Sequence, residues 1–222
     1  MENSIFYQLR KNSGTIWNDY VNHPFVKGLG DGTLPKENFK YYLLQDYLFL
    51  IQFSRAYALA AYKSENLEEM RSATATLDNI LNFEIQLHIE FCDGWGISQG
   101  ELAKTNEDLA TTAYTRFVMD CGNRGDLLDL MTALVPCIVG YAEIGRDLAL
   151  KPHSERQNPY KNWIEMYSGD EYQKVSKDAI QQLQNLFKTR GGSGRYKSLC
   201  AVFNQATRME VEFWEMAWNH RD

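Results

Sequence analysis

The chain has 222 residues, of which 44% are hydrophobic and 23% charged, so it is long enough to bury a sizeable core. Its 23 Lys and Arg residues are outnumbered by 29 Asp and Glu residues, which gives a net charge of −6. Because nucleic-acid binding normally needs a basic surface, this balance argues against DNA or RNA as a partner. The 11 Phe, 13 Tyr and 5 Trp residues far outnumber the 4 His and 4 Cys residues. Rings that could line a pocket are therefore plentiful, whereas metal ligands are few.

In chain order, the hydrophobic pattern predicts helices almost throughout, and no segment shows the sustained alternation of a strand. The expected helices lie at about 4–20 (one or two helices), 35–64, 66–93, 106–122, 126–150, 159–168, 171–189 and 195–219. The breaks between them carry Pro or Gly, as at His23-Pro24 and Gly191-Gly192. Since these turns are short and the composition does not shift, we expect one all-α domain, a helical bundle over residues 1–222.

The four cysteines are Cys92, Cys121, Cys137 and Cys200, without the short spacing of a zinc site. We expect free thiols. The N-terminus lacks the basic and apolar regions of a secretory signal. The longest apolar stretch, 130–142, is shorter than the roughly 20 residues that cross a bilayer. These features predict a cytoplasmic protein without a membrane partner.

The helix at 35–64 carries a carboxylate on its apolar side. Asp46 interrupts a stripe of residues spaced by three or four positions: Phe39, Tyr42, Phe49, Phe53, Tyr57 and Ala60. A buried carboxylate is costly unless it finds hydrogen-bond or charge partners. Asp46 is therefore expected either to satisfy an internal contact or to bind a polar ligand.

The helix at 126–150 places Cys137 and Tyr141 one turn apart on one face. Pro136 removes the helical donor for the Thr132 carbonyl and should kink the helix beside the thiol. Cys137 could be a small core residue or part of a pocket at this kink.

A second inward carboxylate, Glu210, lies on the last helix among Phe203, Ala206, Phe213 and Ala217. Two inward acids on different helices and an inward cysteine form a coherent set for nucleophilic and acid–base chemistry.

Glu84 and His88, four residues apart in the 66–93 helix, could be metal ligands or a structural hydrogen-bonded pair. Helical di-iron sites need about four carboxylates and two histidines from several helices. We expect the structural pair, no metal and no cofactor.

Several segments, in order, resemble one family. They are His23-Pro24-Phe25, 30–35 (GDGTLP), 39–46 (FKYYLLQD), 134–137 (LVPC), 160–167 (YKNWIEMY) and 210–217 (EVEFWEMA). The chain resembles, over nearly its whole length, the TenA family (thiaminase II, aminopyrimidine aminohydrolase), which has the heme-oxygenase-like helical fold.

The resemblance implies roles for individual residues. Cys137 would be the nucleophile and Glu210 the general acid, while Asp46 would bind the exocyclic amine and a ring nitrogen of a pyrimidine. Tyr167 would bond to the substrate or orient Glu210. The remaining implied pocket residues line or stack on the pyrimidine ring: Tyr114, Tyr141 and Phe213.

One position departs from the family pattern. Many members have a tyrosine three residues after the aspartate, near the thiol, where this chain has Phe49, which is itself expected to be a substrate-binding residue. Without that hydroxyl, thiolate formation is expected to be weaker. Cys137 is still expected to be the most reactive of the four thiols.

The implied activity is hydrolysis of 4-amino-5-aminomethyl-2-methylpyrimidine to the hydroxymethyl pyrimidine and ammonia, with thiamine hydrolysis as a related reaction. The resemblance also implies a homotetramer. Two alternatives stay open: a metal-dependent oxygenase on the same scaffold, and a non-catalytic pyrimidine-binding or regulatory protein.

Overall fold

A computed structural model describes residues 4–150 and 158–220, and within these ranges the regular structure is entirely helical. The prediction of an all-α fold is confirmed. The elements are α1 (Ile5–Asn12), α2 (Thr15–Val21), α3 (Pro24–Asp31), α4 (Lys36–Lys63), α5 (Leu67–Asn79), the π-helical segment η1 (Ile80–Glu84), α6 (Ile85–Gly94), α7 (Gln99–Lys104), α8 (Leu109–Arg124), α9 (Leu127–Ala149), α10 (Lys161–Ser168), α11 (Asp170–Arg190) and α12 (Ser193–Trp218).

The predicted helices were found, with three differences. The helix expected at 66–93 is divided into α5 and α6 by η1. Two further helices, α3 and α7, were not predicted. Pro24 occupies the first turn of α3, and the His23 ring accepts a hydrogen bond from the Phe25 N–H, so the expected break is a helix start. Ser98 and Glu101 form a capping box at the start of α7.

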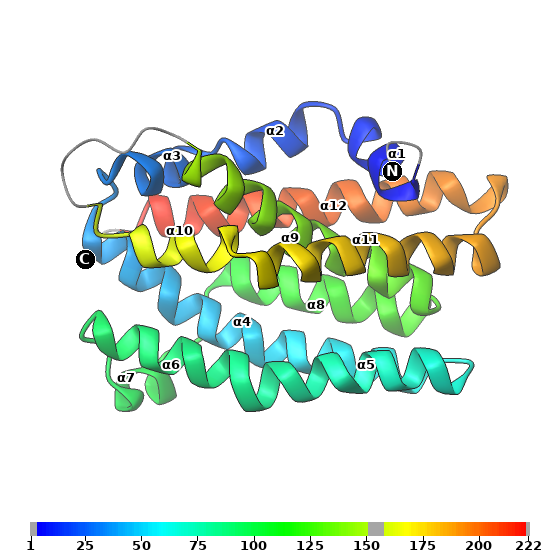
Figure 1. Ribbon diagram of the computed structural model, residues 1–222, viewed down its shortest axis with the longest axis horizontal. Coiled ribbons are helices and arrows are strands. Elements are labelled where there is room, and N and C mark those ends of the chain that lie inside the picture. Colours follow the sequence, from blue (N-terminus) through cyan, green and yellow to red (C-terminus); the bar gives the residue numbers. More distant parts are fainter. Residues whose placement is uncertain (1–3, 151–157, 221–222) are drawn as a thin grey trace.

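The central helix is α9, which packs against α8, α10, α11 and α12. On one side of the molecule, α5, η1 and α6 follow one another along an outer edge and pack on α4 (Figure 1). The helices α4, α8, α9 and α12 therefore face one another in the interior, where the three candidate residues Asp46, Cys137 and Glu210 lie on α4, α9 and α12.

The helix α9 is longer than its apolar stretch suggested. It has 23 residues, so by length and composition it could cross a membrane, and the expectation that this segment is too short was wrong. However, 83% of its most apolar window is buried by the other helices. Its apolar character is accounted for by its position in the core.

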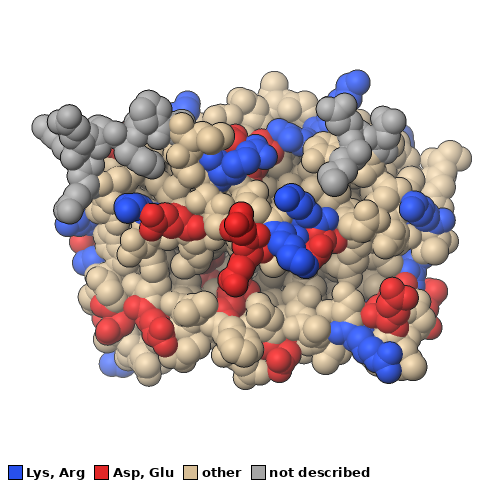
Figure 2. All heavy atoms as spheres, viewed as in Figure 1, with Lys and Arg blue, Asp and Glu red and all other residues tan. Residues whose placement is uncertain are grey.

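The surface in the view of Figure 2 carries Lys and Arg side chains interspersed with Asp and Glu, without a continuous basic area. Large apolar side chains are exposed along the outer edge formed by α5, η1 and α6. They are Leu67, Met70, Leu81, Phe83 and Leu87.

Candidate active site

Glu210 is a carboxylate placed in the core by an otherwise apolar helix face. Its side chain is only 1% exposed, and its Oε1 accepts a hydrogen bond of 2.6 Å from the Tyr114 hydroxyl on α8. Burial raises the pKa of Glu210 to about 8, although the hydrogen bonds from Tyr114 and the Cys137 thiol oppose the shift. At neutral pH this carboxyl can therefore exist in both protonation states, which suits an acid–base group.

Cys137 lies next to Glu210 and is the most accessible of the four thiols. Its side chain is half-buried, whereas Cys92, Cys121 and Cys200 are buried. Burial raises the pKa of Cys137 well above its ordinary value, and the charges of Glu210 and Asp46 raise it further. In the resting site Cys137 is therefore a neutral thiol, and its conversion to a thiolate needs a proton acceptor.

Asp46 is buried on α4, as its place in the apolar stripe predicted. Its Oδ2 lies 3.5 Å from Nδ1 of His88, and Tyr42 also hydrogen-bonds to it. Burial raises the pKa of Asp46, while the positive charge of His88 and the Tyr42 bond lower it. His88 Nε2 lies 2.9 Å from the Leu43 carbonyl, to which it must donate.

The expected Glu84–His88 pair is wrong, because both ring nitrogens of His88 face other groups, on α4. The half-buried Glu84 ends the π-helical segment η1. Burial and the charge of Asp46 raise the pKa of Glu84 to about 7. Within residues 4–150 and 158–220, no three His, Cys, Asp or Glu side chains are arranged to hold a metal ion.

The predicted ring residues gather in two groups around these acids. The Phe49 ring lies 5.1 Å from that of Tyr114 and 5.7 Å from that of Phe213, centroid to centroid. Tyr141 and Tyr167 pack edge to face at 4.9 Å. Aromatic walls of this kind suit a planar ligand.

The position of Tyr167 against α9 requires a small residue in that helix. A Cβ at Gly145 would lie 2.6 Å from the Tyr167 Cβ, so the glycine lets α10 come close to α9. Two further tyrosines at the site were not selected from the sequence. Tyr42 bonds to Asp46, and Tyr20 reaches Glu210 from α2. The stripe that contains Asp46 includes Tyr42, but nothing local points to Tyr20.

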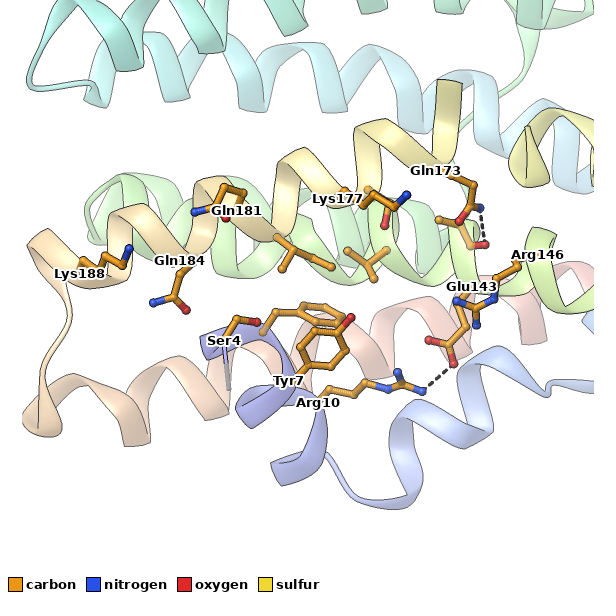
Figure 3. A pocket seen from close by; sticks show the side chains of 15 residues that line it. Ser4, Tyr7, Arg10, Glu143, Arg146, Gln173, Lys177, Gln181, Gln184 and Lys188 are labelled. Carbon is orange, nitrogen blue, oxygen red and sulfur yellow. Dashed lines mark hydrogen bonds and ion pairs between the residues drawn. The ribbon is translucent and has the colours of Figure 1, made fainter. Parts of the chain in front are cut away.

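A separate groove of about 520 Å³ opens between α1, α9 and α11 (Figure 3). Arg10 and Glu143, which form a 2.7 Å ion pair, are among its lining residues, together with Arg146 and Lys177. It uses a different face of α9 from the one that carries Cys137, so it is distinct from the site described above.

The fold and the site together define an all-helical protein with a cysteine and two carboxylates among buried aromatic rings. A model of the TENA/THI-4/PQQC family matches residues 10–220. The chain belongs to this family.

Three similar proteins cover nearly the whole chain. An aminopyrimidine aminohydrolase of Halalkalibacterium halodurans is 37% identical over 98% of this chain and 97% of its own length. An uncharacterized protein of Haemophilus influenzae is 41% identical over 94% and 96% of the two lengths. The crystal structure of a TenA family transcription regulator from Silicibacter sp. TM1040 superimposes with a TM-score of 0.93, at 44% identity and 97% coverage of both chains. The resemblance found in the sequence is confirmed.

Proposed function

We propose that this chain is an aminopyrimidine aminohydrolase of thiamine salvage. It would convert 4-amino-5-aminomethyl-2-methylpyrimidine and water to the 5-hydroxymethyl pyrimidine and ammonia. The observation that carries the proposal is the contact between Cys137 and Glu210 in a ring-lined interior that also contains Asp46. The name of the Halalkalibacterium halodurans relative supports the same reaction.

The first chemical step uses Cys137 as nucleophile. Direct attack of water on the methylene carbon is slow, because the amine is a poor leaving group. When Cys137 sulfur adds to a ring carbon, a C–S bond forms, the thiol proton passes to the Glu210 carboxylate, and the ring gains electron density. A carboxylate of raised pKa is a suitable acceptor, since it is more basic than an ordinary glutamate.

The second step breaks the C–N bond. Glu210 returns the proton to the amine nitrogen, the electron pair of the adduct expels ammonia, and an exocyclic methylene remains. Water then adds to this carbon, the electrons return through the ring, and sulfur leaves. A proton from the water restores the Cys137 thiol, so atoms and charge balance. Expulsion of the thiazole ring by the same steps would give thiamine hydrolysis.

Recognition of the pyrimidine is assigned to the remaining site residues. The Asp46 carboxylate would accept a hydrogen bond from the exocyclic amine and hold a ring nitrogen. Tyr167 would bond to the substrate or orient Glu210. Phe49, Tyr114, Tyr141 and Phe213 would line or stack on the pyrimidine ring. This chemistry uses side chains only, and we propose that no cofactor takes part.

The test is a coupled assay for ammonia released from the aminomethyl pyrimidine. Cys137→Ser should reduce kcat by about a thousandfold or more, because an alcohol is a far weaker nucleophile than a thiol at this pH. Cys121→Ser is the matched control and should retain the wild-type kcat, since Cys121 is a buried thiol on α8. Wild-type turnover by Cys137→Ser would remove the covalent mechanism.

A non-catalytic regulator is the second candidate, because the similar Silicibacter protein is described as a transcription regulator. The Phe49 departure fits a protein that binds the pyrimidine without turning it over. Saturable pyrimidine binding without any ammonia release would establish this candidate and refute the hydrolase.

We further infer a cytoplasmic, single-domain protein that assembles as a homotetramer. The exposed apolar side chains on η1 and α6, Leu81, Phe83 and Leu87, are 51–59% exposed and would be covered in an assembly. Light scattering after gel filtration should give four times the chain mass of 25.7 kDa. A mass of one chain would refute the tetramer.

A further inference from the structure

Tyr20 has a buried hydroxyl that makes no hydrogen bond of full geometry with the described residues, although it lowers the pKa of Glu210 as a nearby donor. The side chain is 0% exposed and lies at the end of α2. Its ring is fixed by Trp17, edge to face at 5.7 Å, and by Trp214, stacked at 6.4 Å. Buried hydroxyls without a partner are rare, so a rigidly held one inside a candidate active site calls for an explanation.

The position of the hydroxyl is fixed on one side by Gly140. A Cβ at Gly140 would lie 2.1 Å from Cε1 of Tyr20 and 2.6 Å from its hydroxyl oxygen, so any other residue would displace the ring. Gly140 follows Cys137 by about one helical turn on α9. The hydroxyl therefore lies against the backbone of α9, one turn from the thiol.

On the other side lies α12. Trp214, which stacks on the Tyr20 ring, follows Glu210 by one turn, so both residues point to the same side of α12. After burial, the ionised forms of Glu210 and Cys137 contribute most to the raised pKa of Tyr20. The Tyr20 hydroxyl is thus close enough to Glu210 and Cys137 to interact with both groups assigned to proton transfer.

We propose that Tyr20 is a positioning residue for the acid–base carboxyl: its hydroxyl donates a second O–H hydrogen bond to Glu210, beside that of Tyr114, when substrate occupies the site. This inference rests on the proposed function. Catalytic hydrogen bonds are often long in the free enzyme and shorten in the complex, which accounts for a hydroxyl that acts on Glu210 as a donor without the geometry of a full hydrogen bond.

The consequence is electrostatic. A donated hydrogen bond stabilises the carboxylate form and lowers the pKa of Glu210, whereas burial raises it. The titratable groups that act on Glu210 from the helices around it are Tyr20 on α2, Asp46 on α4, Tyr114 on α8, Cys137 and Tyr141 on α9, and Tyr172 on α11. Loss of the Tyr20 hydroxyl removes a donor and leaves the others, so the pKa of Glu210 should rise.

Tyr20→Phe tests the proposal through the pH dependence of ammonia release. Because the Glu210 carboxylate must accept the thiol proton of Cys137 in the first step, a higher pKa of Glu210 should move the acid limb of kcat up by about half to one pH unit. At neutral pH, kcat should fall about three- to tenfold with little change in KM. The matched control is Tyr160→Phe, which removes a buried hydroxyl that bonds to the Leu34 carbonyl outside the site. It should lower the Tm and leave the pH profile unchanged.

Gly140→Ala should also remove the hydrogen bond from Tyr20 to Glu210, by moving the Tyr20 ring rather than deleting its hydroxyl. The new methyl group displaces the Tyr20 ring while retaining its hydroxyl, and it should shift the acid limb of kcat in the same direction as Tyr20→Phe. The double variant should show no larger shift than the single ones, because both act on one hydrogen bond.

The outcomes separate the inference from the function on which it rests. If the wild type is active and Tyr20→Phe has an unchanged acid limb, or only a lower Tm, the role of Tyr20 alone is overturned. A wild type that releases no ammonia removes the proposed function and this inference together. A shift of the acid limb to higher pH in Tyr20→Phe that is absent in Tyr160→Phe supports both.

Discussion

The two buried carboxylates of the site, Asp46 and Glu210, lie in different electrostatic surroundings. Asp46 on α4 lies 3.5 Å from the imidazole of His88, whose protonated form lowers the pKa of the carboxyl, although burial keeps this pKa above its ordinary value. Glu210 on α12 faces Tyr114 and Cys137, which are neutral, and burial raises its pKa to about 8. Both are inward acids on apolar helices, and only their partners differ.

This difference gives the two carboxylates different roles, hydrogen-bond acceptance for Asp46 and proton transfer for Glu210. Because His88 Nε2 donates to the Leu43 carbonyl, its Nδ1 meets Asp46 as a donor only when the ring is charged. Such a pair favours an ionised Asp46, which can accept a hydrogen bond from a pyrimidine amine. Glu210 can carry a proton at neutral pH and pass it on. Acid and acceptor roles thus follow from environment rather than residue type.

The largest expected effect is loss of the proton carrier. Glu210→Gln keeps the shape and a hydrogen bond to Tyr114 but cannot transfer a proton, so kcat should fall about a thousandfold. Steady-state ammonia release measures it. The control is Glu212→Gln, an exposed glutamate on the same helix. A less than tenfold loss in Glu210→Gln would assign the acid elsewhere.

A smaller effect is expected when the partner of Asp46 is removed. His88→Gln removes the charge that lowers the pKa of Asp46, so that pKa should rise and the acid limb of kcat/KM should move to higher pH. At about pH 6 we expect roughly a tenfold loss, recovered in part as the pH increases. An acid limb at the same pH as in the wild type would mean that His88 only supports the fold.

The smallest effect concerns stability. Burial raises the pKa of Glu210 from 4.5 to about 8, so the folded state binds this proton more tightly than the unfolded state. Its contribution to stability is complete below about pH 4.5 and is lost as the pH rises to about 8. The difference in Tm between Glu210→Gln and the wild type should therefore be more positive at pH 8 than at pH 5, by a few degrees. Equal changes at both values would contradict a raised pKa.

Much of the fold was predictable, because long amphipathic helices carry strong local signals. The stripes around Asp46 and Glu210 placed both acids in the core before any contact was known. The π-helical segment was not predictable in the same way. It adds a residue to one turn where α5 meets α6 on α4, and the pattern at 66–93 reads equally well as a continuous helix.

The candidate site was predictable as far as single helices define it. Spacing gave Asp46, Cys137 and Glu210 as inward residues, but which groups they contact depends on how helices pack. His88 was assigned to Glu84 because they share a helix face, whereas the structure pairs it with Asp46 on a neighbouring helix. Tyr20 lay beyond local reasoning for the same reason, since only Gly140 on α9 allows its approach.

The difference between the two carboxylates can be measured directly by carboxyl ¹³C NMR, with Glu210→Gln and Asp46→Asn used to assign the resonances. The account predicts that the Glu210 resonance titrates with a midpoint of about 8 and that Asp46 titrates at lower pH. A Glu210 midpoint near its ordinary value of 4.5, or an Asp46 midpoint above that of Glu210, would contradict it.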